Sequence, residues 1–481
     1  MGRKFLSTRG ISTLLLGAVV FSGCIFKPEF TRPEVIKETS YRDESPSPDT
    51  IADLKWWEVF NDPKLEKLIS TALNENRNLL VALARIDQAR GLLGVARPDQ
   101  FPQVQAQGLA LRADTYLVSD VQFPPQNDFA LFAPLSFEVD LWGKYASATE
   151  AQRAELIASD QGYRAATLSL VAEVASTYLR LLNLDRQLEI SQRTVKNRRS
   201  YTVIIKERWK GGYTNKLDFD QAQIQEKEAE ATVIFFQRQV RQTENAMSVL
   251  LGHTPHAIER SGPKTNPISL KKIPAGTPAM LLERRPDVRA AEESARAALM
   301  RVGVARSMQY PGIGLSGLIG LNSGDVSTLF SADGRVWSVG GAFLGPLIDL
   351  GKSWSRTTAA EAEAEQALRS YEQVVLQAVR EVEDAMIAIR TYDAENKVRT
   401  EQVTAASSGD MLSRARYDNG IASFLEVLNT QTSLFESQLS QSASEQLYLT
   451  SIIQLYKALG GGWQRKEGDV KLPAKGWEFY Q

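Results

Sequence analysis

Cysteine and histidine are almost absent from this chain. Its 481 residues include one cysteine, Cys24, and two histidines, His253 and His256. Two imidazoles without cysteines or nearby carboxylates are a poor ligand set for a metal ion. They also leave no Ser–His or Cys–His nucleophile pair to assemble. The sequence therefore predicts no metal centre, no cofactor and no enzyme activity.

The chain also lacks an excess of basic charge and, beyond its first residues, any long apolar run. It has 56 Lys and Arg against 57 Asp and Glu, for a net charge of -1. Binding to a phosphate backbone requires clustered basic charge, so nucleic acid is excluded as a partner. A mean hydropathy of -0.25 does not fit a bundle of transmembrane helices.

The N-terminus predicts export and a lipid anchor. Basic residues precede an apolar stretch at 11–21, as in a signal peptide over 1–23. Phe21 to Cys24 resembles a bacterial lipobox with Phe21 in place of the usual leucine, which implies cleavage before Cys24 and a covalent lipid on its sulfur. The alternative is a free cysteine beside a signal peptide. In lipoproteins, an aspartate directly after the lipidated cysteine implies retention in the inner membrane. This chain has Ile25 at that position, which favours the outer membrane.

Proline is missing from two long stretches, 144–210 and 352–418. A helix of that length extends roughly 100 Å, far beyond the usual three turns. We predict one helix over each stretch, a further helix after each at 215–251 and 421–459, and an earlier one at 65–97.

The spacing of apolar residues predicts that these helices pair as coiled coils. Residues three and four apart in turn form one seam, which is typical of left-handed supercoiling. The seam residues are Leu168, Val171, Ala175, Tyr178 and Leu182 in the first stretch and Leu368, Tyr371, Val375, Ala378, Val382, Ala385 and Ile389 in the second. Gly212 and Gly420 suit the left-handed residue that ends a helix. Each helix pair is therefore predicted to be an antiparallel hairpin with a glycine at its tip.

Four further stretches have the alternating pattern of strands, at about 101–113, 129–141, 311–321 and 336–350. Each is near the length that crosses a bilayer as a tilted strand. Four strands do not close a barrel, and open sheet edges are not tolerated in lipid. The prediction is an α+β membrane protein in which several chains share one barrel.

The second half of the chain repeats the first at an offset of 208–209 residues. Trp142 has no counterpart, and the offset changes there. The matches include Gly94–Arg97 with Gly303–Arg306, Asp140-Leu141 with Asp349-Leu350, Gly143-Lys144 with Gly351-Lys352, Gly212 with Gly420, and Leu251-Gly252 with Leu459-Gly460. The expected order is a signal peptide at 1–23, a lipidated tether at 24–63, a first repeat at 64–252, a linker at 253–285, a second repeat at 286–463 and a polar tail at 464–481.

Several motifs resemble those of the outer-membrane factor family, the TolC-type exit ducts, in its NodT/OprM lipoprotein branch. They are Leu282–Asp287, Gly303–Arg306, Phe137–Lys144 and Leu455–Trp463, and the resemblance covers about residues 56–463. It implies a homotrimer with a twelve-stranded outer-membrane barrel and a periplasmic helical tunnel. It also implies a periplasmic adaptor (membrane fusion) protein and an inner-membrane pump as partners. We expect a passive duct for small molecules that works with a pump of the resistance-nodulation-division type.

The resemblance and the charge pattern together suggest site residues. Cys24 is the expected lipid anchor, and Gly212 and Gly420 mark tips expected to contact the adaptor, unless they are turn glycines alone. The candidate pore gate is a set of charges near the tips: Arg208, Asp410, Arg414, Arg416 and Asp418. Exposed ion pairs are weak, so a gate needs several. The alternatives are a solvated helix face, or an apolar plug formed by Met411 and Leu412.

Two other functions fit the same sequence. The first is an outer-membrane duct for protein export with an ATP-driven transporter. The second is a periplasmic coiled-coil scaffold lipoprotein without a pore, which predicts that the alternating stretches are not membrane strands.

Overall fold

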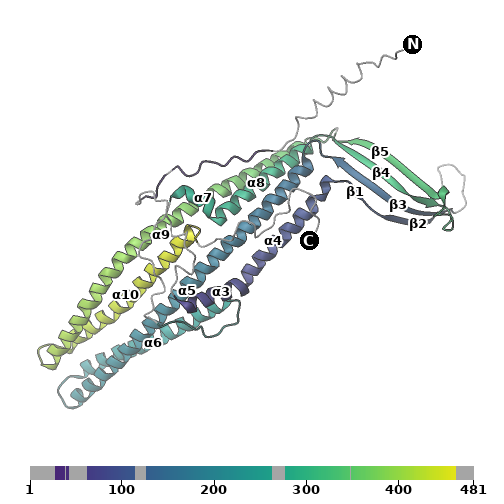
Figure 1. Cartoon of the computed structure of the whole chain (residues 1–481). Coiled ribbons are helices and arrows are strands. Elements are labelled where there is room, and N and C mark those ends of the chain that lie inside the picture. The colour runs from purple at the N-terminus through teal and green to yellow at the C-terminus, as the bar shows by residue number, and fades with distance from the viewer. Residues whose placement is uncertain are drawn as a thin grey trace, which may run out of the picture. The chain divides into compact units, whose positions relative to one another are not determined.

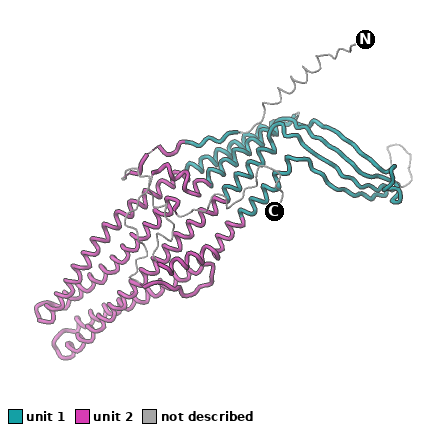
Figure 2. The backbone as a smooth tube through the Cα atoms, in the orientation of Figure 1, with its two compact units in different colours: residues 1–33, 85–159, 290–372 teal, residues 34–84, 160–289, 373–481 magenta. Residues whose placement is uncertain are grey.

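The computed structural model describes residues 28–37, 39–42, 62–113, 126–262, 277–346 and 348–461. Cys24 and the predicted tail at 464–481 lie outside the described residues. The chain forms two compact units (Figure 2). Unit 1 comprises 1–33, 85–159 and 290–372, and unit 2 comprises 34–84, 160–289 and 373–481. Each unit contains residues of both predicted repeats, since elements of one copy pair with elements of the other.

Unit 1 holds one antiparallel sheet (Figure 1). β3 (Gln126–Val139) pairs with β4 (Gly312–Ser323), and β4 pairs with β5 (Arg335–Leu344). The short β1 (Gln103–Val104) and β2 (Gln107–Ala113) follow one another along the opposite edge of β3. Within the described residues the sheet is thus four strands wide, with one edge formed by β5 and the other by β1 and β2.

The register separates the two faces of this sheet. Cross-strand partners share a face, and successive residues alternate between faces. One face, called the apolar face below, carries Phe129, Leu131, Leu135, Phe137, Val139, Ile313, Leu315, Ile319, Leu321, Trp337, Val339 and Phe343. The opposite face is richer in small and polar side chains, among them Asp128, Ser136, Glu138, Ser316, Asn322 and Ser338. The alternation predicted from the sequence is therefore confirmed as far as Val139.

The ends of the strands differ from the prediction. The expected strand at 336–350 stops at Leu344. Gly345 packs against Pro311, whose Cβ would lie 2.4 Å from an added Cβ, and Pro346 has no N–H with which to continue a ladder. The expected strand at 101–113 is divided into β1 and β2, and β3 begins at Gln126 rather than at 129.

The two longest helices have the predicted bounds. α5 spans Lys144–Lys210 and α9 spans Lys352–Asp418. After short turns they are followed by α6 (Lys216–Leu250) and α10 (Phe424–Ala458). The most apolar 18-residue window of α5 has a mean hydropathy of only 1.2, and 61% of it is buried in the protein. It is therefore a core segment by burial.

The single helix predicted at 65–97 is wrong. The structure has α3 (Pro63–Glu75) and α4 (Arg77–Ala96), separated by Asn76 in an extended conformation. Leu79 N–H donates to Asn76 Oδ1 at 3.0 Å, so Asn76 caps the second helix. The remaining described helices are α7 (Leu281–Arg284), α8 (Pro286–Ser307) and the short 3₁₀ turns Pro98–Gln100, Pro278–Met280 and Ala332–Gly334.

Most residues of the predicted seams are buried. Val375, Ala378, Val382 and Ala385 of unit 2 are buried, as are the five seam residues of α5. Tyr371, in unit 1, is also buried, whereas Leu368 and Ile389, at the two ends of the second seam, are partly buried. Near the hairpin tips an apolar cluster joins the two hairpins: Ile205, Ala222, Phe424, Val427 and Leu428. Burying apolar surface stabilises a protein by about 25 cal/mol per Å² of area removed from water. This shared cluster therefore holds the two hairpins of one chain against each other near their tips.

Candidate functional site

The two hairpin tips of unit 2 share one turn geometry. Gly212 and Gly420 have φ angles of 75° and 72°, in the left-handed region that glycine adopts without strain. The next residue in each turn reaches back along its helix. Tyr213 N–H donates to the Arg208 carbonyl oxygen, and Ile421 N–H donates to that of Arg416, both at 2.8 Å. Each helix thus ends in a Schellman turn.

The same turns project apolar side chains into solvent. Tyr213 is 87% exposed and Ile421 68% exposed. Leu217 and Leu425, four residues further on in each copy, are also exposed. Two matched apolar pairs at the ends of both hairpins form a surface, called the tip surface below, that suits contact with another protein.

Arg208 links the two hairpins close to their tips. Its Nη2 lies 3.5 Å from Asp418 Oδ1, and its guanidinium lies 5.0 Å from the centre of the Tyr417 ring. Arg208 belongs to α5, whereas Tyr417 and Asp418 belong to α9. Both contacts therefore hold one hairpin to the other.

The other candidate gate charges have different partners. Arg414 Nε donates to Asp410 Oδ1 at 2.8 Å within α9, and its guanidinium lies 4.8 Å from the Tyr201 ring of α5. Arg416 Nε lies 3.1 Å from Glu426 Oε1 of α10, within the second hairpin. The five residues named from the sequence thus belong to three separate ion pairs, the third of them completed by Glu426, rather than to one cluster.

Sequence reasoning missed the aromatic half of these links. Tyr201 and Tyr417 each accept a guanidinium over their rings, an interaction worth about 0.5–1 kcal/mol at exposed sites. The only sequence signal was an aromatic residue in the last turns of a helix that also carries arginine. Met411 and Leu412, the alternative plug, are both exposed in the chain.

A buried arginine holds the hairpins together further from the tips. Arg198 Nη1 donates to the Gln225 carbonyl oxygen at 2.7 Å, and its Nη2 lies 3.5 Å from Thr432 Oγ1. Its guanidinium lies 5.4 Å from the Phe435 ring. Burial lowers the pKa of Arg198 despite the nearby carboxylate of Glu228. The residue therefore carries a desolvated charge in the interface of α5 with α6 and α10.

At the end of each hairpin remote from its tip, the last turn of the second helix contacts a break between two other helices, and this contact is called a joint below. The joint of the first copy is uncharged. Nδ2 of Asn76 donates to the carbonyl oxygen of Leu250 at 2.8 Å. Gly252 has a φ of 78°, and a Cβ there would lie 2.2 Å from the Glu75 carbonyl oxygen. Only glycine permits this approach of the end of α6 to the break between α3 and α4.

The second copy repeats this joint at the equivalent positions. Nη1 of Arg285 donates to the carbonyl oxygen of Ala458 at 2.8 Å. Gly460 has a φ of 72°, and a Cβ there would lie 2.9 Å from the Arg284 carbonyl oxygen. The donor, the acceptor and the glycine each lie 208 or 209 residues after their counterparts. The Leu282–Asp287 motif thus contacts the Leu455–Trp463 motif.

The two joints differ in charge. Arg285 is buried and also binds Asp287 through Nε at 3.0 Å and Nη2 at 2.6 Å. The same Nη2 lies 2.8 Å from Glu381 Oε2 of α9. Burial opposes the charge of Arg285, but the two carboxylates outweigh it and raise its pKa. In the second joint, the charged side chain of Arg285 therefore contacts three helices at once, α8, α9 and α10.

A further network anchors the described start of the linker. Arg260 Nε and Nη2 donate to Asp185 at 2.5 and 2.9 Å, and Nη1 donates to Glu244 at 2.7 Å. Tyr178 Oη donates to Asp62 Oδ2 at 2.7 Å and accepts from Ser261 N–H at 3.0 Å. Burial, with the Asp62 carboxylate, raises the pKa of Tyr178 to about 12. The linker is thus fixed to α5 and α6 where it leaves the first copy.

The strand-to-helix turns of unit 1 explain the one-residue slip in the repeat. Asp140 and Asp349 each accept from a helix N-terminal amide at 2.8 Å, from Ala146 and Ser353. A carboxylate at this position accepts hydrogen bonds from backbone N–H groups that have no partner within the helix, and its negative charge interacts favourably with the helix dipole. The unmatched Trp142 donates from Nε1 to the Pro311 carbonyl oxygen at 2.8 Å. It therefore joins the first turn to the start of the second copy's sheet.

The histidines do not form a ligand cluster. His253 Nε2 lies 2.9 Å from Glu75 Oε2, and His256 N–H donates to Ser248 Oγ at 3.1 Å. Within the described residues no group of three or more His, Cys, Asp or Glu side chains is placed to hold a metal ion.

Comparisons with known proteins agree with this architecture. The family model for outer membrane efflux proteins matches residues 68–253 and 277–461, one segment for each copy of the repeat. The chain is 32% identical over 462 residues to outer membrane protein OprJ of Pseudomonas aeruginosa, covering 94% of this chain and 96% of OprJ. It is 30% identical over 474 residues to the solvent efflux pump outer membrane protein SrpC of Pseudomonas putida, covering 96% and 99% of the two chains.

The fold has a matching relative among solved structures. A membrane protein from Pseudomonas aeruginosa superposes with a TM-score of 0.86 at 31% identity, covering 92% of this chain and 98% of the other. The chain therefore belongs to the family of outer membrane efflux proteins and is an outer-membrane channel component of an efflux system.

Proposed function

We propose that three copies of this chain form the exit duct of a tripartite efflux system. In this proposal the sheets combine into one twelve-stranded barrel and the hairpins into one tunnel. The supporting observation is the sheet of unit 1, which has two open edges and one apolar face. Because lipid offers no partner for an open strand edge, the β5 edge of one copy pairs with the β1–β2 edge of the next.

The partners follow from the family and the tip surface. A periplasmic adaptor binds the hairpin tips, an inner-membrane pump of the resistance-nodulation-division type supplies the energy, and Cys24 carries the lipid anchor. The relative SrpC is named for a solvent efflux pump, which supports small apolar molecules as cargo. The links of Arg208 and Arg414 between the hairpins hold the tunnel end closed at rest.

Deletion of the gene tests this function. We expect increased susceptibility to antibiotics, detergents or solvents, restored by the wild-type gene, and a heat-sensitive trimer on gels of the outer-membrane fraction. The matched control is complementation with the same gene carrying Cys24→Ala, which separates the duct from its anchor. Release of the protein as a monomer by a carbonate wash would favour the scaffold function, and lost protein secretion with unchanged susceptibility would favour the export function.

The tip surface gives a more specific prediction. We expect Tyr213→Ala with Ile421→Ala to weaken adaptor binding about 30-fold or more, since exposed aromatic and aliphatic anchors at an interface contribute 2 kcal/mol or more. Both side chains are exposed, so the thermal stability of the purified protein should not change. Surface plasmon resonance against the adaptor measures the affinity.

Val398→Ala is the matched control for that experiment. Val398 is 64% exposed on the same long helix, α9, but lies away from the tip. We expect this variant to bind the adaptor like the wild type. Equal binding by the tip variant and the wild type would show that the adaptor contacts another surface.

A further inference from the structure

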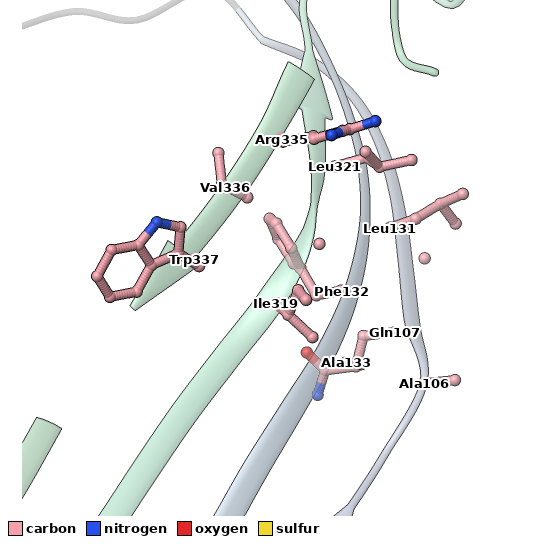
Figure 3. A pocket seen from close by; sticks show the side chains of 12 residues that line it. Ala106, Gln107, Leu131, Phe132, Ala133, Ile319, Leu321, Arg335, Val336 and Trp337 are labelled. Carbon is pink, nitrogen blue, oxygen red and sulfur yellow. The ribbon is translucent and has the colours of Figure 1, made fainter. Parts of the chain in front are cut away.

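Charged residues are rare in the sheet, and their placement is uneven. The described strands contain four: Arg112 in β2, Asp128 and Glu138 in β3, and Arg335 in β5. Arg335 pairs with Leu321, and Leu321 pairs with Leu131. Cross-strand partners share a face, so Arg335, Leu321 and Leu131 lie on one face, and Phe132 and Val336 lie on the other; Figure 3 labels all five. Arg335 therefore lies on the apolar face.

Arg112 lies on the same face. It pairs with Asn127, which alternation places on the side of Leu131. The two acids lie on the opposite face, where Asp128 Oδ1 accepts from Asn322 Nδ2 at 2.8 Å. Glu138 accepts from Lys144 Nζ at 3.0 Å. Every described charge on the apolar face is thus an arginine, and neither arginine has an ion-pair partner among the described residues.

Both arginines lie at the strand ends that are remote from the helices. Arg335 is the first residue of β5, and Arg112 is the residue before the last of β2. At the other end of the sheet, β3 leads into α5. Since the helices of an outer-membrane efflux channel extend into the periplasm, the arginine end faces the outer leaflet.

We infer that Arg112 and Arg335 bind the phosphate groups of phosphorylated lipids in the outer leaflet. This inference depends on the proposed barrel. An arginine on the lipid side of a barrel costs about 2–4 kcal/mol at the midplane but about 0–1 kcal/mol near the interface, so it is tolerated only beside headgroups. The guanidinium binds phosphate with two parallel hydrogen bonds.

Two further features support a lipid as the occupant. Trp337, on the same face two residues after Arg335, is 78% exposed, and aromatic side chains at this level anchor barrels in the interface. The arginines also belong to the two open edges of the sheet. When β5 of one copy pairs with the β1–β2 edge of the next, each seam carries Arg335 from one copy and the arginine equivalent to Arg112 from the other.

Lipid binding by the purified full-length protein tests this inference. The probe is bisphosphorylated lipid A in detergent, and native mass spectrometry measures its dissociation constant. We expect Arg112→Gln with Arg335→Gln to weaken binding about 25-fold, because one basic residue near an anionic membrane surface contributes about 1 kcal/mol, or about fivefold. Lysine at both positions keeps the charge but loses the two-point hydrogen bonds, so its affinity should lie between those of the wild type and the double glutamine variant. Dephosphorylated lipid A should bind the wild type as weakly as bisphosphorylated lipid A binds the double glutamine variant.

Three controls make the result decisive. Arg380→Gln, on an exposed part of α9, should bind lipid A like the wild type, and millimolar inorganic phosphate should not compete. Affinity of the double glutamine variant within about twofold of the wild type, or competition by inorganic phosphate, would overturn the inference.

Single-channel conductance in a planar bilayer is measured on the same samples. A wild-type protein that forms no channel contradicts the proposed function, whereas conducting variants with unchanged lipid affinity contradict only the inference about lipid.

Discussion

Replacing Arg285 with alanine is expected to reduce the free energy of unfolding by about 3–5 kcal/mol, the usual cost of breaking a buried ion pair from one side. The guanidinium is buried and donates to the Ala458 carbonyl oxygen as well as to the carboxylates of Asp287 and Glu381. Removal leaves the last turn of α10 and the Asp287 carboxylate without this donor, while Glu381 keeps the hydrogen bond from Gln377 Nε2 at 3.1 Å. Guanidinium chloride unfolding of the solubilised protein, followed by circular dichroism, measures the change.

The first copy supplies a matched control for this substitution. Asn76→Ala removes the equivalent donor to Leu250 and also the cap of α4, but no ion pair. We expect a loss of about 1–3 kcal/mol for the unsatisfied buried group and about 1 kcal/mol more for the lost cap. Arg285→Lys keeps the charge but loses the two-point contact with Asp287. Its loss in the free energy of unfolding should lie between those of the two alanine variants. A loss for Arg285→Ala of only about 1–3 kcal/mol, the cost of an unsatisfied buried group alone, would show that the ionic part of the second joint contributes nothing to stability.

The difference between the joints has a consequence for the hairpins. In the second copy, Glu381 brings α9 into the joint as well as α10. Both helices of the second hairpin are therefore fixed at one charged point. In the first copy, the neutral side chain of Asn76 donates to the end of α6 and forms no ion pair. The two copies therefore fix their hairpins by different contacts, one neutral and one ionic.

The long helices and their tips were predictable because the deciding signals are local. The absence of proline, the seven-residue apolar repeat and a glycine after the last turn each act within a few residues of the feature that they determine. The faces of β3 were predictable for the same reason, since the pleat forces alternation. These signals do not depend on which distant segment packs alongside.

The features that the sequence did not reveal depend on distant contacts. No proline or glycine marks the break at Asn76, because its extended conformation is stabilised by a carbonyl oxygen 174 residues away. The end of β5 depends on Pro311, in the turn before β4. The partners of the tip charges depend on the rotational phase of α5 against α9, and one residue changes that phase by about 100°.

Loss of the links between the hairpins is expected to open the channel. Arg208 contacts Asp418 and the Tyr417 ring, and Arg414 lies over the Tyr201 ring. Exposed ion pairs contribute about 0–1 kcal/mol and exposed cation–π contacts about 0.5–1 kcal/mol. Together the three contacts stabilise the closed tip by about 1–3 kcal/mol per chain, and about 1.4 kcal/mol is a factor of ten in the equilibrium. Arg208→Ala with Arg414→Ala should therefore raise the open fraction by about five- to 150-fold, as measured by single-channel recording in a planar bilayer.

Arg416→Ala is the matched control, because Arg416 contacts Glu426 inside the second hairpin and does not join the two hairpins. We expect the closed-state behaviour of the wild type from this variant. Exchange of the charges in Arg208→Asp with Asp418→Arg restores an ion pair between α5 and α9, so it should close the channel again relative to Arg208→Asp alone. If all of these variants remain as closed as the wild type, the contacts between the tips of one chain do not control the pore, and the gate depends on contacts between copies.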